Sequence, residues 1–188
     1  MLTFDEANHV YRWNEAVVPS VTQILKHGGI IDDRWYTEDA RDRGVAVHKA
    51  ADLHIRNNLD EGSIHPVVRP YFDGLLRFMK DTRFKPMLQF CEVRQFHPIY
   101  IYAGTPDFFG ILNGRPALID VKTGDARQSA RYQTAAYANF PMLKAYSPDR
   151  FDLRLYNDGR YKLNPHHDVK DFNVFLSCLN VARAKGAF

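Results

Sequence analysis

Apolar residues recur with a helical period in several stretches of the chain. Val47, Ala51 and Ile55 are spaced four apart, which places them along one stripe of a helix. Such a stripe is typical of a helix that packs one face against a core. The helices predicted in this way cover residues 39–57, 67–80, 128–146 and 169–183.

The stretches between these helices read as strands or short connections. Ser20 with Gln23 three residues later fits a capping box, so a short helix is expected through Leu25. Asn113-Gly114 is a strong hairpin signal between two extended segments. The predicted strands lie in residues 2–13 (a hairpin), 89–96, 100–112, 116–122, 151–156 and 160–163.

This order of elements predicts a central mixed sheet flanked by helices, α/β or α+β in class. A length of 188 residues suits one domain with a full core. We therefore expect a single domain over residues 1–188. Its N-terminal hairpin and short helix (1–38) would precede the core (39–188).

Composition narrows the function classes only modestly. The formal net charge of +3 is compatible with a polyanionic partner but does not require one. The two cysteines are too few for a disulfide framework, and a reducing cytoplasm is the expected setting. The N-terminus lacks the features of a signal peptide, and no apolar run approaches the roughly 18 residues of a membrane span, so no membrane association is expected.

One predicted strand carries charged residues inside an apolar run. Asp120 and Lys122 are two positions apart, so they point to one face of the strand, while Ile119 and Val121 point to the other. Two interpretations are open. The pair could be a weak ion pair on an exposed edge strand, or it could be part of a metal site with a lysine beside it.

A second carboxylate is expected opposite the first. Counting outward from the Asn113-Gly114 turn, Asp107 faces Asp120 directly across the ladder. Directly opposed like charges are destabilising unless something positive lies between them. A divalent cation is the simplest such group, and Mg²⁺ commonly uses one or two carboxylates. Lys122 would then lie beside the metal, where it can stabilise developing negative charge.

Further polar residues have both a structural and a functional interpretation. Glu92, one predicted strand earlier, is either an outward-facing residue or another ligand. His48 is either a solvated helix residue or a ligand, and small neighbours would let its helix approach another element closely. Gln133 and Tyr137 share a helix face, either as a plain surface or as a border of the site.

These residues, taken in order, resemble the PD-(D/E)XK nuclease superfamily, and more narrowly its RecB-type exonuclease branch. That branch includes CRISPR-associated, mitochondrial genome-maintenance and many phage exonucleases. The resemblance covers about residues 43–138, and the N-terminal Pro19-Ser20-Val21-Thr22 also looks like phage and mitochondrial members. The motifs that carry it are His48, Glu92, Gly104-Thr105-Pro106-Asp107, Asp120-Val121-Lys122 and Gln133-x-x-x-Tyr137.

The resemblance implies a restriction-endonuclease-like core and a divalent-metal-dependent DNA exonuclease. His48, Asp107, Asp120 and the backbone carbonyl of Val121 would hold Mg²⁺ or Mn²⁺, and Lys122 would be catalytic. Glu92 would join the catalytic acids and help to bind a second ion or a coordinated water. The residues expected to contact substrate are Gln133, Tyr137, Arg131, Arg43 and Thr123, with Arg41, Lys49 and Arg127 as further phosphate-binding candidates. Tyr132 and Tyr137 could stack on unpaired bases or pack in the core.

Some features depart from the family. Several members use four cysteines to hold an iron–sulfur cluster, so with two cysteines no cluster is expected here. No helicase phosphate loop is present in the sequence. The expected partners are therefore DNA, as single strands or duplex ends, and a separate single-strand-binding, annealing or helicase protein. The expected setting is phage or prophage DNA processing in the cytoplasm of a bacterial host.

Three other functions remain open at this point. The chain could be a DNA endonuclease of the same fold, or a module that grips DNA without cutting it. It could also be a small-molecule metalloenzyme, which would show no salt-dependent affinity for DNA. Strand polarity, the choice between DNA and RNA, and the oligomeric state do not follow from the sequence.

Overall fold

The computed structural model describes residues 1–6, 8–32, 34, 37–124 and 129–188. The chain begins with a three-stranded antiparallel sheet made of β1 (Leu2–Asp5), β2 (Val10–Trp13) and β3 (Ala16–Val18). Helix α1 (Val21–His27) follows, and both hydrogen bonds of the Ser20–Gln23 capping box are present. The N-terminal hairpin and the capped helix are therefore confirmed, and β3 is an addition.

The centre of the molecule is a five-stranded mixed sheet in the order β10-β9-β8-β7-β4. Strands β8 and β9 are parallel, and the other neighbours are antiparallel. A separate antiparallel pair, β5 (Gln95–His97) and β6 (Tyr102–Gly104), lies beside it. The central strands are β4 (Lys85–Pro86), β7 (Phe108–Leu112), β8 (Arg115–Lys122), β9 (Asp149–Leu155) and β10 (Tyr161–His166).

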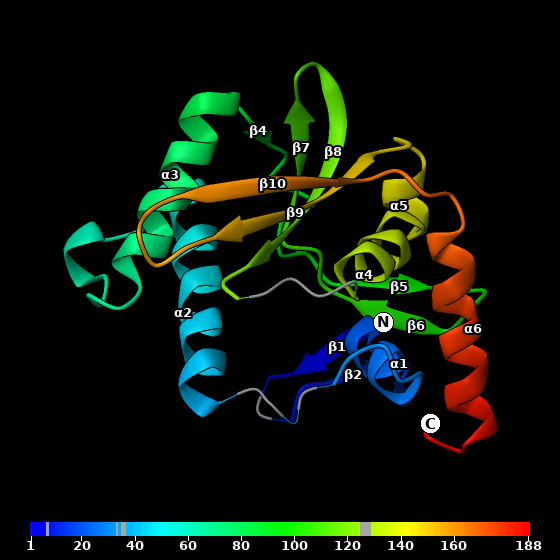
Figure 1. Cartoon of the computed structure of the whole chain (residues 1–188). Coiled ribbons are helices and arrows are strands. Elements are labelled where there is room, and N and C mark those ends of the chain that lie inside the picture. Colours follow the sequence, from blue (N-terminus) through cyan, green and yellow to red (C-terminus); the bar gives the residue numbers. More distant parts are fainter. Residues whose placement is uncertain (7, 33, 35–36, 125–128) are drawn as a thin grey trace.

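Helices cover both faces of this sheet (Figure 1). On one face, α2 (Glu38–Ile55) and α3 (Arg69–Thr82) share a hydrophobic cluster with Ile119 and Val121 of β8. On the other face, α1, α4 (Ser129–Ala138) and α6 (Asp171–Ala184) share a second cluster with Leu118. The short α5 (Pro141–Lys144) and a 3-10 turn (Glu61–Ser63) complete the helices of the described residues. The predicted fold class, a mixed sheet flanked by helices, is confirmed.

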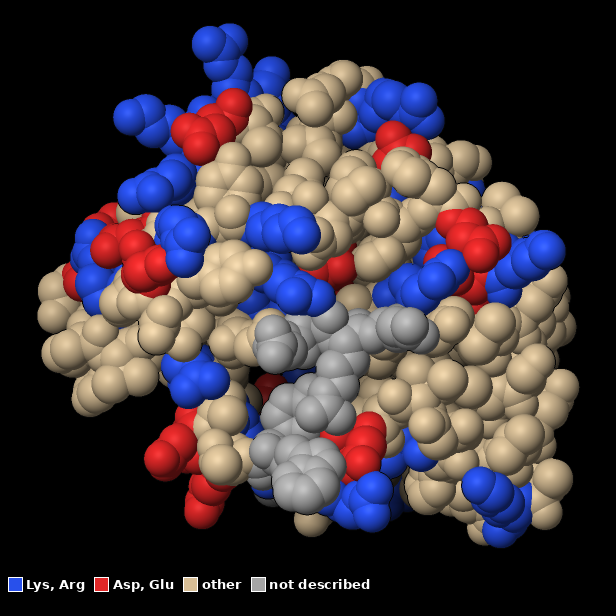
Figure 2. Space-filling model, in the orientation of Figure 1, with Lys and Arg blue, Asp and Glu red and all other residues tan. Residues whose placement is uncertain are grey.

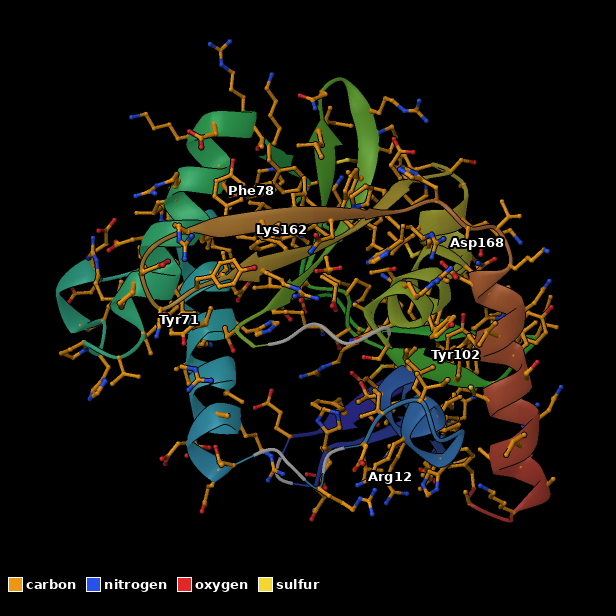
Figure 3. All side chains as sticks on the ribbon, viewed as in Figure 1. Arg12, Tyr71, Phe78, Tyr102, Lys162 and Asp168 are labelled. Carbon is orange, nitrogen blue, oxygen red and sulfur yellow. The ribbon has the colours of Figure 1, made fainter. Side chains whose placement is uncertain are left out.

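The two clusters are built around large aromatic side chains. Phe78 of α3 lies in the first cluster, and Tyr102 of β6 lies in the second (Figure 3). The Tyr102 ring contacts Phe175 with ring centroids 4.9 Å apart, and its hydroxyl donates to the Ala136 carbonyl at 2.8 Å. Tyr102 therefore links the β5–β6 pair to α4 and α6.

The surface over β9 and β10 is rich in basic side chains. In Figure 2, Lys and Arg side chains gather at the centre of the view, where β9 and β10 run side by side in Figure 1. No helix in the described part of the chain is long and apolar enough to cross a membrane.

The predicted strand over residues 89–96 is wrong for most of its length. Only β5 at its end is extended, and residues 88–92 form turns. Hydrogen bonds made by Cys91 and Glu92 explain the turn. The Glu92 N–H donates to the Pro106 and Asp107 carbonyls at 2.9 and 3.1 Å, while the Cys91 thiol donates to the Phe109 carbonyl. These bonds fold the segment back against the start of β7.

Two other predicted elements are divided in the structure. The predicted strand over residues 100–112 breaks at residues 105–107, so β6 and β7 belong to different sheets. The predicted helix over residues 128–146 stops at Ala138, and a new short helix, α5, begins at Pro141. Proline lacks an N–H and disfavours helix continuation through it.

Candidate functional site

Three side chains from distant parts of the chain meet at one end of the central sheet. His48, Glu92 and Asp107 each place a ligand atom within 4.8 Å of the others, close enough to hold one metal ion. The His48 Nδ1 atom lies 3.3 Å from Asp107 Oδ1 and 3.7 Å from Glu92 Oε1. An imidazole and two carboxylates form a donor set that divalent cations accept.

Each of the three side chains is held by its own local structure. His48 follows Val47 on α2, and Val47 is buried in the core, so the histidine lies at the edge of that buried stripe. Glu92 adopts a left-handed backbone conformation, with a φ of 53°, in the turn described above. Arg56 supports this turn by donating to the Cys91 carbonyl at 2.9 Å. Glu92 is therefore placed by a turn and not by the strand that the sequence predicted.

Asp107 joins this group to strand β8. Its Oδ2 accepts a 2.6 Å hydrogen bond from the Val121 N–H, and its Oδ1 faces His48. The β7–β8 register ends at the pair Phe108–Ile119, so Asp107 lies in a bend one residue before that ladder, close enough to Asp120 for its charge to act to raise the pKa of that carboxyl. The Asn113-Gly114 turn has positive φ at both residues, which is the geometry of a two-residue hairpin.

The charges in this group shift one another's pKa values. Burial alone would lower the pKa of His48, but the Asp107 and Glu92 carboxylates outweigh it and raise that pKa to about 10. Burial raises the pKa of Glu92 to about 7, against the opposing effect of His48. Burial also acts to raise the pKa of Asp107, but the charge of His48 outweighs it and the pKa is lowered. Without a metal, His48 therefore holds a proton and supplies positive charge between the two acids.

Asp120 lies outside this three-residue group and forms an ion pair with Lys122. It is 1% exposed, and Lys122 Nζ lies 2.6 Å from its Oδ2. Burial raises the pKa of Asp120 to about 6, while Lys122 opposes that shift. The second oxygen, Oδ1, is buried and has no hydrogen-bond partner among the residues that the structure describes. This oxygen is free to accept a ligand at the site.

A chain of hydrogen bonds connects Lys122 to helix α4. Lys122 Nζ donates to Gln133 Oε1 at 3.1 Å, and Gln133 Nε2 donates to the Tyr137 hydroxyl at 3.1 Å. Tyr137 itself is 5% exposed and packs in the second hydrophobic cluster. The predicted base-stacking interpretation of Tyr137 is therefore wrong for the folded chain, and its core-packing alternative holds. Gln133 borders the Asp120–Lys122 pair, as predicted.

The other predicted substrate contacts lie at different places. Thr123 is close to α2, because a Cβ added to Gly44 would lie 3.7 Å from its hydroxyl. Arg43 stacks its guanidinium over the Tyr71 ring at 5.4 Å. Arg131 is engaged elsewhere, in ion pairs with Asp168 at 3.0 Å and Asp171 at 2.7 Å. Tyr132 is partly buried, with the Arg131 guanidinium over its ring. The side chains of Arg41 and Lys49 are exposed on α2. Arg127 lies outside the described residues.

The structure adds contacts that sequence reasoning did not find. The Tyr11 hydroxyl hydrogen-bonds Thr105 Oγ1 at 2.7 Å and so ties the N-terminal sheet to the segment that carries Asp107. A Cβ added to Gly104 would lie 2.7 Å from Tyr137 Cε1, so the glycine makes room for that ring. Gly104 and Thr105 belong to the Gly-Thr-Pro-Asp motif, so the sequence did draw attention to these two positions. No sequence signal identified Tyr11.

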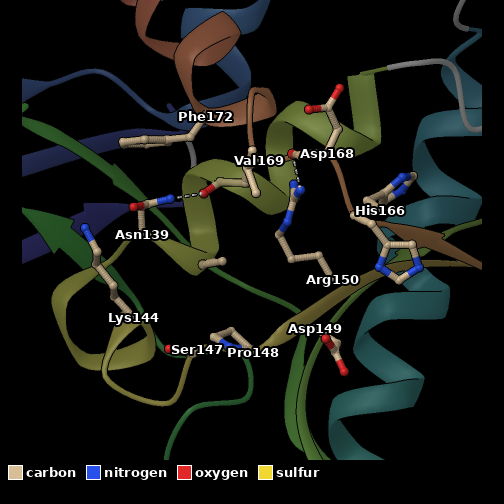
Figure 4. Close-up of a pocket in the computed structure, with 13 residues that line it drawn as sticks. Asn139, Lys144, Ser147, Pro148, Asp149, Arg150, His166, Asp168, Val169 and Phe172 are labelled. Atoms are coloured by element: carbon tan, nitrogen blue, oxygen red, sulfur yellow. Dashed lines mark hydrogen bonds between the residues drawn. The ribbon is translucent and has the colours of Figure 1, made fainter.

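A separate pocket lies past the end of α4 (Figure 4). Residues of α4, α5, β9, β10 and α6 and of the segments between them line it, including Asn139, Arg150, His166 and Phe172. None of the predicted site residues is among its lining residues in the part of the chain that the structure describes. The candidate site is therefore the cluster at the β7–β8 end of the sheet, and not this pocket.

Comparison with known proteins places the fold. No protein-family model matches the chain, and no curated protein matches it in sequence. A candidate exonuclease from Eubacterium rectale matches in structure with a TM-score of 0.50 and 13% identity, over 88% of this chain and 73% of that one. LHK-Exo in complex with dAMP matches with a TM-score of 0.42 and 11% identity, over 90% and 88% of the two chains. The fold is therefore one that this chain shares with the candidate exonuclease from Eubacterium rectale.

Proposed function

We propose that this chain is a divalent-metal-dependent DNA exonuclease that hydrolyses phosphodiester bonds. One observation carries the proposal. His48, Glu92 and Asp107 converge from three separate segments, next to the ion pair of buried Asp120 with half-buried Lys122. In the hydrolysis of a phosphodiester, a bound metal ion would activate water, and a lysine beside it would stabilise the negative charge that develops in the transition state.

The donor atoms present fit a divalent cation. His48, Glu92 and Asp107 would hold it, with Asp120 Oδ1 and the Val121 carbonyl as further ligands. The unpartnered buried Oδ1 of Asp120 supports this set, because a buried acceptor without a partner is costly unless a ligand satisfies it. Mg²⁺ and Mn²⁺ favour carboxylate and carbonyl oxygens. Such an ion would lower the pKa of a coordinated water and neutralise charge on the phosphate.

Lys122 is the residue placed to act on the reacting phosphate. Its ammonium is held between Asp120 and Gln133, so its position is fixed before substrate arrives. A preorganised charge of this kind stabilises negative charge that develops in the transition state. Gln133 would act through Lys122 as a positioning residue.

Two lines of support favour DNA and an exonuclease over the alternatives. The motifs resemble the RecB-type exonuclease branch, and the fold is shared with a candidate exonuclease. The net charge of +3 and the basic surface over β9 and β10 suit a polyanionic substrate. An endonuclease and a module that does not cut remain the outcomes against which the proposal is tested.

The test is digestion of 5′- and 3′-labelled single- and double-stranded DNA, beside a plasmid-nicking assay. Wild type would be compared with Lys122→Ala and Asp120→Asn in Mg²⁺, Mn²⁺ or EDTA. We expect metal-dependent release of label, reduced on the order of a hundredfold to a thousandfold in each variant. Lys85→Ala is the matched control, because Lys85 is an exposed strand lysine on β4 at the opposite edge of the sheet from β10.

Each alternative gives a distinct result. Plasmid nicking without release from ends would assign an endonuclease. DNA binding without cutting under any metal condition would assign a binding module. Equal activity of Lys122→Ala and Lys85→Ala would remove Lys122 from the mechanism.

A further inference from the structure

Three cations stand in one row across the central sheet. Lys122 of β8 is paired in register with Arg154 of β9, and Arg154 is paired with Lys162 of β10. Side chains of directly paired residues point to the same face of a sheet. The row therefore begins at the candidate catalytic lysine and ends at β10, which is the edge strand.

The fold itself does not require this row. Directly opposed like charges destabilise a sheet, and the exposed side chain of Lys162 forms no hydrogen bond or ion pair with a described residue that would offset this cost. Arg154 contacts Asp152, with Nε 3.6 Å from Oδ2. The residues flanking Lys162, Tyr161 and Leu163, point the other way and pack on the core. The hairpin is thus anchored by its apolar face and leaves the Lys162 side chain exposed on the other face.

An aromatic residue and a further arginine extend the row at the hairpin end. The Tyr156 N–H donates to the Arg160 carbonyl at 3.0 Å, and the Arg160 guanidinium lies 5.8 Å from the Tyr156 ring centroid. Arg160 also pairs with Asp158 at 2.7 Å, but both side chains are exposed, so a phosphate can compete with that pair. Basic side chains with an interleaved aromatic ring are typical of single-strand binding.

We propose that the β9–β10 hairpin binds single-stranded DNA next to the candidate catalytic site. Arg154, Lys162 and Arg160 contact phosphates, and the Tyr156 ring contacts a base further along the strand. Two strand spacings separate Lys122 from Lys162 by about 10 Å between Cα atoms. That distance equals about three nucleotides at the rise of one duplex strand. A single row of cations matches the phosphates of one DNA strand better than the two phosphate backbones of a duplex. Lys162 is labelled in Figure 3, and the basic surface appears in Figure 2.

This inference rests on the proposed function, so its test measures binding apart from cutting. Binding of a labelled single-stranded oligothymidylate would be followed by fluorescence anisotropy in EDTA over a series of salt concentrations. We expect Arg160→Ala/Lys162→Ala to weaken binding and to reduce the slope of log K against log salt by about 1.4, at about 0.7 for each lost phosphate contact. A matched double variant, Arg77→Ala/Lys85→Ala, removes the same two residue types from exposed positions on α3 and β4, and should leave the slope unchanged.

The outcomes separate the two proposals. A reduced slope in the hairpin variant alone supports the binding surface, even if no metal condition gives cutting. An unchanged slope in a hairpin variant that melts like wild type overturns it, and leaves the nuclease proposal standing if wild type cuts. Equal losses of DNA affinity in both double variants also overturn it, because they indicate that the overall positive charge, and not the hairpin, attracts the DNA. If wild type neither binds nor cuts, the proposed function fails and this inference fails with it.

Discussion

Asp107 is the residue at which the charges of the candidate site are balanced. Its two oxygens have different tasks, because Oδ2 accepts from the Val121 N–H and Oδ1 faces His48. The sequence predicted that something positive must separate Asp107 from Asp120. In the structure, protonated His48 lies on one side and Lys122 on the other. A metal bound by His48 would have to displace that proton, since a metal ligand must be deprotonated.

Gly104 is a residue whose size determines how Tyr137 packs. A Cβ at this position would lie 2.7 Å from Tyr137 Cε1, and Tyr137 carries the hydrogen bond to Gln133. We expect Gly104→Ala to destabilise the chain by about 1–3 kcal/mol through overpacking and to lower activity by displacing Gln133. Urea unfolding and a nuclease assay would measure the two effects.

Gly124→Ala is the control for that substitution, because a Cβ there meets no atom of the described residues within 4 Å. Wild-type stability in Gly104→Ala would show that the ring moves aside without cost, and would contradict the assigned role of Gly104.

Among the elements, the β8–β9–β10 strands carry a polar ladder on the face beside α4. Asp120 is paired in register with Asp152, and Asp152 with Asn164. Asp152 is 2% exposed and accepts from Asn164 Nδ2 at 2.8 Å, with His166 Nε2 at 2.7 Å. This carboxylate therefore fastens β10 to β9 beside the candidate site.

The ladder predicts a particular sensitivity to acid. Burial acts to raise the pKa of Asp152, but its bonds to His166 and Asn164 outweigh burial and lower that pKa. A group with a depressed folded-state pKa stabilises the fold above its unfolded pKa of about 4 and loses that contribution as the pH falls through the folded value. We expect the free energy of unfolding to decrease below about pH 4. In Asp152→Asn this decrease should be smaller than in wild type.

Urea midpoints measured for wild type and Asp152→Asn from about pH 7 to about pH 3 would check this. Asp42→Asn is a suitable control, because Asp42 is an exposed residue on α2. Parallel curves for wild type and Asp152→Asn would show that Asp152 does not contribute to the acid limb.

At the scale of the whole molecule, the candidate metal ligands connect parts that are separate in sequence. His48 lies on α2, Glu92 in the turn before β5, and Asp107 just before β7. An ion held by all three would bind the folded chain and not the unfolded one. Binding of this kind stabilises the folded state by mass action.

We therefore expect Mn²⁺ or Mg²⁺ to raise the melting temperature. At a concentration one hundred times the dissociation constant, the gain is about 2.7 kcal/mol, or roughly 5–10 °C for a chain of this size. His48→Ala should lose most of this shift, while His167→Ala, an exposed histidine beyond β10, should retain it. Differential scanning calorimetry with metal and then with excess EDTA would measure the shift and its reversal. An equal shift in both variants would place the ion elsewhere.

The sequence determined those parts of the site that depend on short-range geometry. The alternation of a strand puts Asp120 and Lys122 on one face, and the two-residue Asn113-Gly114 turn fixes which residue opposes which, so Asp107 could be placed close to Asp120. The capped first helix followed from the Ser20–Gln23 capping box, most helix spans from the spacing of apolar residues, and the mixed sheet from the order of the elements.

The tertiary structure alone decided the rest. Glu92 reaches His48 because hydrogen bonds to the Pro106 and Asp107 carbonyls hold a turn where the apolar pattern predicted a strand. Arg131 is engaged by Asp168 and Asp171, and the alignment of Lys162 with Lys122 arises from the pairing of three strands. Each of these depends on contacts between residues far apart in the chain, and local propensity carries no information about such contacts.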